Sequence, residues 1–328
     1  MTKPITFDTI TSKEHTSQHR GIANTAFAGK AAIVDLGSNS FRLLVGTFDG
    51  TTWHNEPKRL WTTRLGQRDA NGLLTPDAFE RGLAALREIN EAIQAYGATV
   101  VLGAATSAIR EAPNGATFMA EAVKVCPMEA KILTGEEEAM YGFYGAVTDI
   151  AEPGFQYATV DVGGGSTEIA IGDVDGVVWR KSYPVGAVRL REKSDEGPQA
   201  VWEETSPWFD PWPLTALFGG CVAIGGTATT LAAMALKLTT YDGTKIQGYK
   251  LMRETVEDLV MRLRWASPEE RLQFPGLPAN RADIIVAGAE IITSFMDTYQ
   301  LPYIVTSDTD GMEGLQRAVV ERLMTYEG

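Results

Sequence analysis

Runs of apolar residues separated by short turns mark the first hundred positions. Residues 31–36 and 41–48 are apolar runs joined by a Gly-Ser-Asn-Ser turn, and this pattern predicts a β-hairpin. A stripe of apolar residues with helical spacing follows Thr75-Pro76, a pair suited to the start of a helix. The continuous apolar run at 99–106 predicts another buried strand. The order of these elements is typical of an α/β fold.

A second strand–turn–strand pattern occurs in the middle of the chain. Residues 159–172 read TVDVGGGSTEIAIG, with an apolar run on each side of three glycines. Asp161 ends the first of these runs, as Asp35 ends the first run near the N-terminus. We interpret the repeat as an internal duplication that produces two domains of similar topology. A third glycine turn follows another strand and opens a helix at Thr227.

The remaining pattern is mostly helical. Thr134 and Glu137 fit a capping box at the start of one more helix. The further predicted elements are helices at 134–147, 251–265 and 282–299, a strand at 303–308, and a closing helix at 311–324 that packs on the first half. The predicted organisation is a flexible arm at 1–28, a first domain at 29–148 plus about 312–328, and a second domain at 149–311.

Composition and charge narrow the class of partner. The chain has 328 residues, 44% of them hydrophobic and 22% charged, as in an ordinary globular protein. Its net charge of −13 disfavours nucleic acid and anionic membranes as partners. Because the chain has no long apolar stretch, we expect neither a transmembrane helix nor a secretory signal. Two cysteines form no disulfide framework, and three histidines lack metal-ligand spacing. These counts fit a cytoplasmic location.

The glycine turns are candidate anion sites. Glycine permits positive φ, and successive backbone N–H groups can then face a ligand. A glycine turn that opens a helix adds the helix dipole. One such turn can serve backbone geometry alone, but three in one chain predict a ligand with several phosphates. The predicted phosphate-binding residues are Asp35, Gly37, Ser38, Asn39, Ser40, Gly163, Gly164, Gly165, Ser166, Thr167, Gly225, Gly226 and Thr227.

Two carboxylates beside the triple-glycine turn suggest a divalent cation. Asp161 and Glu168 lie on opposite sides of the turn, and in a hairpin their side chains can point to the same side. Carboxylates repel phosphate unless a cation bridges them, and Mg²⁺ binds in this way to one or two carboxylates, water and substrate oxygens. The alternative is that Asp161 only caps its own turn.

Several segments together resemble one family. In order, they read VDLGSNSFRLL, GAATSAIREAPNG, LTGEEEA, VDVGGGSTEIAIG, PVGAVRL and AIGGTATTLAA, and GLPANRADIIVAGAEII resembles the family's C-terminal region. They resemble the exopolyphosphatase / guanosine pentaphosphate phosphohydrolase (Ppx/GppA) family in its short two-domain form. The resemblance implies an α/β fold of two actin-like ATPase (ribonuclease H-like) domains with the active site in the cleft between them.

The resemblance also implies roles for individual residues. Asp161 and Glu168 match the positions expected to hold the metal, with Mg²⁺ or another divalent cation as cofactor. Arg110 matches an arginine expected to contact the phosphate chain. Glu138 matches the proposed general base, and the residues themselves favour it only modestly over Glu136 and Glu137, because it shares a helix face with small residues. The implied reaction is hydrolysis of a phosphoanhydride bond by a positioned water.

The chain departs from the family pattern in two places. The region after GAVRL is compressed and carries Trp202, Trp208 and Trp212, which more often pack a loop than stack on a base. The late stretch SDTDGMEGL lacks an arginine that relatives commonly show. Both departures bear on substrate preference more than on catalysis.

Three functions remain open on the sequence alone. The first is an exopolyphosphatase that releases orthophosphate from inorganic polyphosphate. The second is hydrolysis of guanosine pentaphosphate (pppGpp) at the same site. The third is a non-catalytic polyphosphate or nucleotide sensor, against which the presence of Glu138, Asp161 and Glu168 argues. Homodimers are common among relatives, and the resemblance carries that expectation over.

Overall fold

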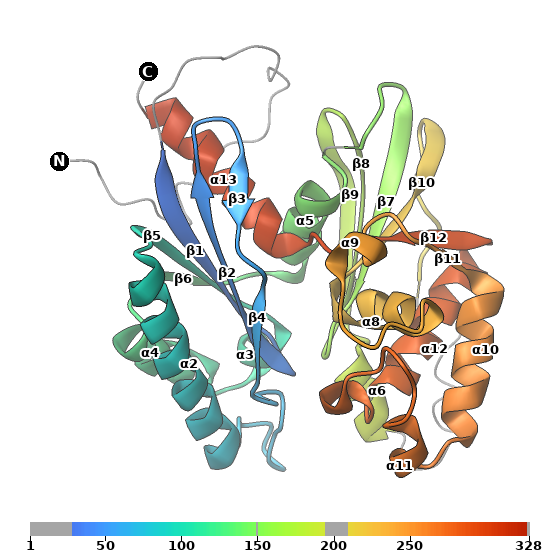
Figure 1. The fold of residues 1–328 in the computed structure, drawn as a ribbon, viewed down its shortest axis with the longest axis horizontal. Helices are drawn as coiled ribbons and strands as arrows, with labels where there is room; N and C mark the ends of the chain where they lie inside the picture. Colours follow the sequence, from blue (N-terminus) through green and yellow to red (C-terminus); the bar gives the residue numbers. More distant parts are fainter. Residues whose placement is uncertain (1–27, 149, 194–208, 327–328) are drawn as a thin grey trace. The chain divides into compact units, whose positions relative to one another are not determined.

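A computed structural model describes residues 28–148, 150–193 and 209–326. The contacts divide these residues into two compact units, one reaching Thr134 and resuming at Met312, the other spanning Gly135–Gly311 (Figure 1). Residues 1–27 of the predicted N-terminal arm, and also Trp202 and Trp208, lie outside the described residues. The two units are described separately below.

The first unit is built on a mixed sheet with the strand order β3-β2-β1-β5-β6, and β4 also pairs with β2. Its strands are β1 (Gly29–Leu36), β2 (Ser40–Phe48), β3 (Trp53–Asn55), β4 (Arg59–Thr62), β5 (Val100–Ala105) and β6 (Glu129–Ile132). β1 and β2 form the predicted antiparallel hairpin, and β1, β5 and β6 run parallel. The carboxyl ends of these three parallel strands therefore meet at one edge of the sheet.

The helices of the first unit are α2 (Pro76–Tyr96), α3 (Ser107–Glu111), α4 (Gly115–Val125) and α13 (Gly311–Tyr326). The predicted start of α2 is confirmed, because the Thr75 side chain accepts a hydrogen bond from the Ala78 N–H at 3.3 Å. α2 and α4 lie side by side on one face of the sheet (Figure 1). The closing helix packs on the first unit as predicted, since Gln316 and Asn55 exchange side-chain hydrogen bonds at 2.9 and 3.0 Å.

The second unit has a mixed sheet with the order β11-β12-β10-β7-β8-β9. Its strands are β7 (Phe155–Val162), β8 (Thr167–Asp173), β9 (Gly176–Tyr183), β10 (Leu217–Ile224), β11 (Lys250–Met252) and β12 (Tyr303–Thr306). β7 and β8 form an antiparallel hairpin, and β7, β10 and β12 run parallel. The first unit shows the same arrangement, so the two sheets repeat one topology, as the internal duplication predicts.

The helical segments of the second unit are α5 (Gly135–Ala146), α6 (Ala187–Lys193), α8 (Gly225–Ala235), α9 (Gly243–Ile246), α10 (Arg253–Trp265), α11 (Pro268–Arg271), η2 (Ala279–Arg281) and α12 (Ile285–Thr298). α10 and α12 confirm the predicted helices to within three residues at each end, and α8 begins two residues before its predicted start at Thr227. α5 belongs to this unit, whereas sequence reasoning assigned it to the first domain. The reason is packing, because Ala139, Phe143 and Ala146 form a core with Ala170, Val222 and Ile224.

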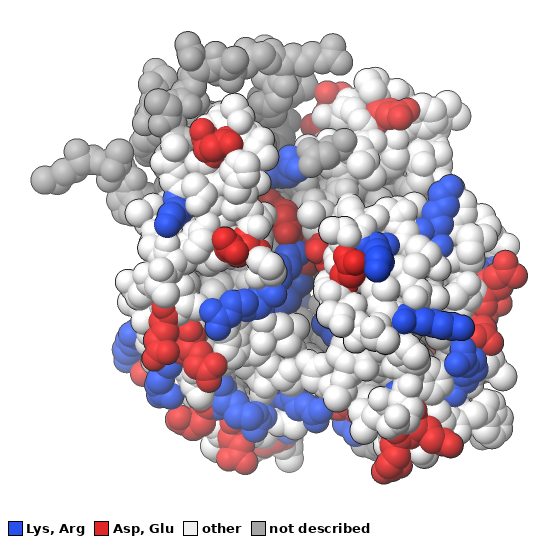
Figure 2. Space-filling model, viewed as in Figure 1, with Lys and Arg blue, Asp and Glu red and all other residues white. Residues whose placement is uncertain are grey.

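The surface charge is mixed. Figure 2 shows acidic and basic side chains interspersed over one face of the protein. None of the helices in the described ranges combines the length and the apolarity that a membrane span requires.

Candidate functional site

The turn of the first unit joins β1 to β2 and is tight. A Cβ added at Gly37 would lie 2.7 Å from the carbonyl oxygen of Ser40, so only glycine fits here without a shift of the backbone. Ser38 is buried, and its hydroxyl lies 3.1 Å from the hydroxyl of Ser107 at the start of α3. The turn is therefore connected directly to the carboxyl end of β5.

Residues 63–66 hold the carbonyl groups of the same turn. The N–H of Gly66 donates to the oxygen of Ser38 at 2.8 Å, and the N–H of Arg64 donates to the oxygen of Asn39 at 2.8 Å. In a trans peptide the C=O and the following N–H point in opposite directions. The N–H groups of Asn39 and Ser40 therefore point away from residues 63–66. Sequence reasoning missed this segment.

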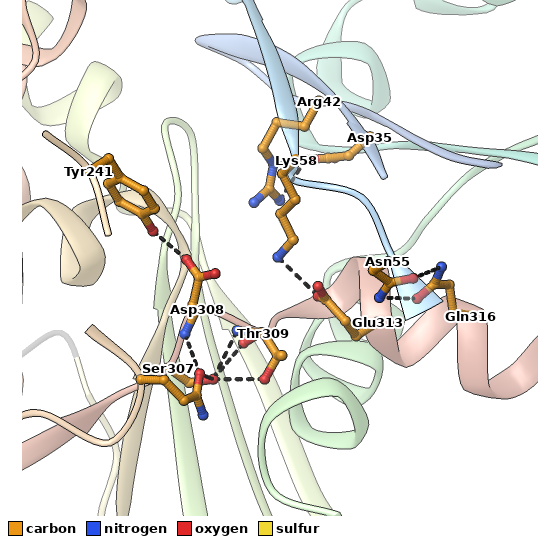
Figure 3. A network of polar contacts seen from close by, with 11 residues as sticks. Asp35, Arg42, Asn55, Lys58, Tyr241, Ser307, Asp308, Thr309, Glu313 and Gln316 are labelled. Atoms are coloured by element: carbon orange, nitrogen blue, oxygen red, sulfur yellow. Dashed lines mark hydrogen bonds and ion pairs between the residues drawn. The ribbon is translucent and has the colours of Figure 1, made fainter. Parts of the chain in front are cut away.

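Asp35 is paired with a cation. It lies opposite Arg42 in the hairpin, and Arg42 Nε donates to Asp35 Oδ2 at 2.8 Å (Figure 3). Arg42 Nη2 approaches the same oxygen at 2.7 Å, and both side chains keep partial exposure. Asp35 was predicted as a phosphate-binding residue. In this geometry its carboxylate orients the guanidinium of Arg42, a group that itself attracts phosphate.

Arg110 lies on α3 at the carboxyl edge of the first sheet. Its Nη1 donates to the backbone oxygen of Leu133 at 2.7 Å, directly after β6 ends. The side chain is neither fully buried nor fully exposed. The structure thus places a guanidinium at the edge where ligands bind in sheets with parallel strands.

In the second unit, Asp161 and Glu168 are directly opposite each other on β7 and β8. Opposite residues in an antiparallel pair project to the same face, with Cβ atoms about 4.5–5.5 Å apart. The two carboxylates therefore lie side by side, as the sequence suggested. Glu168 is 5% exposed and accepts a hydrogen bond from the Ser182 hydroxyl at 2.7 Å. Sequence reasoning missed Ser182.

The triple-glycine turn directs its carbonyl groups toward α6. Backbone N–H groups at the start of α6 donate to the oxygens of Gly163 and Gly164 at 2.9 and 2.8 Å, and Arg189 Nε donates to the oxygen of Gly165 at 2.8 Å. By the same trans-peptide geometry, the N–H groups of Gly164, Gly165 and Ser166 point away from α6. Successive N–H groups on one side of a turn form an anion-binding concavity.

Two of the predicted phosphate-binding residues, Thr167 and Thr227, use their hydroxyl groups in hydrogen bonds to the backbone. Thr167 is fully buried and donates to the backbone oxygen of Val185 at 2.7 Å. Thr227 is 5% exposed and donates to the backbone oxygen of Val162 at 2.8 Å. These side chains fasten the turns to their surroundings, so their hydroxyl hydrogens are already used within the protein.

The third glycine turn joins β10 to α8 and lies against charged groups. Gly225 has φ +76°, and a Cβ added there would overlap the carboxylate of Asp161. A Cβ added at Gly226 would overlap the guanidinium of Arg281, which therefore lies over the first turn of α8. The helix dipole and this cation both favour an anion at the same place. The sequence did not predict Arg281. Gly226 at the helix start was the only related signal, because a glycine there permits another group to approach closely.

The three glutamates at the start of α5 have different surroundings. Glu136 is 65% exposed and lies 3.8 Å from Arg180. Glu138 shares a helix face with Gly135 and Gly142, because residues three or four positions apart are neighbours. A Cβ added at Gly135 would overlap Ser182, and one at Gly142 would lie 2.8 Å from Ile224 Cδ1. The face that carries Glu138 thus contacts β9 and the end of β10.

The paired carboxylates are donors of the kind that Mg²⁺ takes from proteins. Across the described ranges, no group of three or more His, Cys, Asp or Glu side chains is arranged to hold a metal ion. Asp161 and Glu168 supply two adjacent carboxylates. Mg²⁺ is usually held by one or two carboxylates with water and phosphate oxygens as its other ligands. The donor set is consistent with such a site.

Two α/β units that repeat one sheet topology, with a glycine turn beside the paired carboxylates of Asp161 and Glu168, define the class of fold. The sequence profile of the Ppx/GppA phosphatase family matches residues 58–322. The chain belongs to this family, whose members hydrolyse phosphoanhydride bonds, and the predicted family, fold class and enzyme class are confirmed.

Relatives match nearly the whole chain. Exopolyphosphatase 2 of Mycobacterium tuberculosis is 30% identical over 312 residues, which cover 87% of this chain and 97% of that protein. The crystal structure of an exopolyphosphatase-like protein gives a TM-score of 0.78 at 26% identity, covering 90% of this chain and 99% of the other. The Aquifex aeolicus member of the Ppx/GppA family gives a TM-score of 0.74 at 26% identity, covering 92% and 100%.

Proposed function

We propose that this protein is a Mg²⁺-dependent exopolyphosphatase that hydrolyses the terminal phosphoanhydride bond of inorganic polyphosphate and releases orthophosphate. The observation that carries the proposal is the pairing of Asp161 with Glu168 beside a turn whose N–H groups point away from α6. This arrangement offers a cation site next to an anion site. The name of the Mycobacterium tuberculosis relative supports the choice of polyphosphate.

The turns and cations bind the phosphate chain. Backbone N–H groups of Gly164, Gly165 and Ser166 donate to phosphate oxygens, and Arg281 adds positive charge over the start of α8. Within the first unit, Arg42 and Arg110 are the cations that we assign to phosphate binding. Such fixed donors stabilise charge that develops in the transition state, because they need no reorganisation during the reaction.

The metal is assigned to the paired carboxylates. Asp161 and Glu168 would hold Mg²⁺, which when bound offsets negative charge on the phosphoryl group. Without a cation the two carboxylates would repel an incoming phosphate. Both residues sit on strand ends inside a hydrogen-bonded hairpin, so their positions are set by the sheet and not by a mobile loop.

Glu138 is assigned as the general base. It orients a water and accepts its proton, while the water oxygen attacks the terminal phosphorus and the bond to the bridging oxygen breaks. The shortened chain leaves on that oxygen. Glu138 is distinguished from Glu136 by its partial burial and by sharing a helix face with Gly142, which lies against the end of β10, whereas Glu136 is 65% exposed. A base of this kind contributes about 10²–10⁴-fold to the rate.

The test is phosphate release from long-chain polyphosphate and from pppGpp, measured side by side with Mg²⁺ and with EDTA. We expect Mg²⁺-dependent release from polyphosphate that is lost in Glu138→Gln. Release from pppGpp alone would replace the proposed substrate with the nucleotide. Tight binding of both without release would identify a sensor and overturn the enzyme assignment. Cytoplasmic location and a homodimer stay predictions, the latter tested by light scattering.

A further inference from the structure

Three side chains form a row across the hairpin sheet of the second unit. Asp161 on β7 is opposite Glu168 on β8, and Glu168 is in turn opposite Ser182 on β9. Opposite residues on adjacent antiparallel strands share a face, so all three side chains project to the same side of the sheet. Ser182 is thus the next position outward from the paired carboxylates.

The hydroxyl of Ser182 contacts Glu168 directly. It donates to Glu168 Oε1 at 2.7 Å, a short hydrogen bond of the charge-assisted type. Glu168 is 5% exposed, and a buried carboxylate needs donors to offset the loss of water. A hydrogen bond to one carboxylate oxygen sets the plane of the group, and thereby the direction in which it presents its lone pairs.

Ser182 also contacts the start of α5. A Cβ added at Gly135 would overlap both Cβ and Oγ of Ser182, and it would lie 3.7 Å from Glu168 Oε1. Gly135 therefore permits the close approach of α5 to β9. Glu138 lies three residues further along the same helix face. One serine thus touches the side chain of Glu168 and the helix that carries Glu138.

We infer that Ser182 is a positioning residue that orients the Glu168 carboxylate for a divalent cation and sets the approach of α5. This rests on the proposed function, since it takes Glu168 as a metal ligand. Partners that orient metal ligands typically contribute 10–100-fold to metal affinity. Ser182 touches no substrate in this assignment, and its effect passes through Glu168 and Gly135.

The test measures Mn²⁺ binding to the full-length protein by electron paramagnetic resonance, a readout independent of activity. We expect Ser182→Ala to weaken Mn²⁺ binding by about 10–100-fold. Phosphate release should need correspondingly more metal and should recover at saturating Mn²⁺. The matched control is Thr47→Val, which removes a strand hydroxyl that bonds Tyr96 at 2.9 Å, far along β2 from the turn. This control should leave Mn²⁺ affinity unchanged.

Two more variants separate the possible outcomes. Glu168→Gln should abolish Mn²⁺ binding, and if it does not, the metal site of the proposed function is wrong. If Glu168→Gln abolishes binding while Ser182→Ala leaves it within twofold, the metal site stands and the inference about Ser182 is overturned. Gly135→Ala keeps the hydroxyl but displaces it, and it should also weaken Mn²⁺ binding. Unfolding curves in EDTA show which variants remain folded.

Discussion

The carboxylate of Asp161 occupies the space that a side chain on Gly225 would need. A Cβ added at Gly225 would overlap Asp161 Oδ1 and lie 2.9 Å from Asp161 Cγ, and the backbone there has φ +76°. The strand end that carries the carboxylate and the helix start that carries the dipole are therefore in contact. Glycine at 225 is required twice, once for its backbone conformation and once for its lack of a side chain.

This contact predicts a specific effect of Gly225→Ala. The matched control is Gly248→Ala, because Gly248 also has φ +76° but no atom within 4 Å of an added Cβ. The control should lose about 1 kcal/mol from the left-handed backbone alone. Gly225→Ala should lose more in urea unfolding, and it should lose metal-dependent phosphate release because Asp161 is displaced. Equal losses in the two variants would contradict the contact.

Glu138→Gln and Glu136→Gln should differ sharply in activity. Glu138 is partly buried and shares a face of α5 with Gly142, which lies against the end of β10, whereas Glu136 is 65% exposed. We expect Glu138→Gln to lower kcat by about 10²–10⁴-fold with little change in polyphosphate binding. Glu136→Gln should retain nearly full kcat. Steady-state kinetics on both variants checks this, and comparable losses would reject Glu138 as the distinct base.

Removal of the Arg281 guanidinium should weaken substrate binding. It lies over Gly226 at the start of α8, where its charge adds to the helix dipole. We expect Arg281→Gln to raise the KM for polyphosphate by about tenfold or more, since a charge-assisted hydrogen bond contributes about 1.5–3 kcal/mol. Arg271→Gln removes an arginine whose Nε donates to the backbone oxygen of Leu263, and it serves as the control. A KM unchanged in Arg281→Gln contradicts an anion site at α8.

The cysteines should react only when the protein unfolds. Burial raises the pKa of the Cys126 thiol to about 11, and it raises that of Cys221 as well. At pH 8 the raised pKa of Cys126 should by itself slow its labelling in the native protein about 10²-fold relative to the urea-unfolded chain. Rapid labelling of either cysteine in the folded protein would contradict its burial.

The same pKa shift has a consequence for stability. Because the folded pKa of Cys126 exceeds the unfolded value near 8.5, its contribution to stability is complete below that pH and is lost as pH rises toward 11. The urea midpoint should fall across this range, and Cys126→Ala should show a smaller fall. Parallel curves for the two proteins would contradict the assignment.

A stabilising substitution is expected at the end of α8. Lys237 follows the helix in the left-handed region with φ +52°, and the N–H of the next residue, Leu238, donates to the oxygen of Ala233 at 2.9 Å. Glycine is the usual residue in this capping position. Lys237→Gly should raise the free energy of unfolding by about 1 kcal/mol, whereas Lys237→Ala should not. Urea unfolding of both variants distinguishes a backbone effect from loss of the lysine side chain.

Elements with strong local signals were predictable. α2 has its own start signal in Thr75 and Pro76, and both residues act as predicted. The short strands β3, β4, β6 and β11 were not predicted, because three or four residues carry little periodicity, and the eight-residue edge strand β9 was missed because its pattern is mostly exposed. α5 was assigned to the first domain because a helix's own pattern shows which face is apolar but not which sheet covers it.

The candidate site also contains residues that the sequence predicted and partners that it did not. Asp161, Glu168 and the glycines were visible because strand ends and glycine turns are local features. The partners that give them geometry were not visible, since Ser182 is 14 residues from Glu168 and Arg281 is 55 residues from Gly226 in the chain. Such pairs meet only through strand register and helix packing.

By itself, the sequence determined the order of strands and helices, the duplicated hairpins and the positions of the glycine turns. Each of these depends on side chains and backbone conformations within a few neighbouring residues. Only the tertiary structure decided that Thr167 and Thr227 anchor the turns, that Asp35 orients Arg42, and that Ser182 contacts Glu168. These outcomes depend on which distant groups the fold brings within hydrogen-bonding distance, and one residue's local sequence does not encode its distant partner.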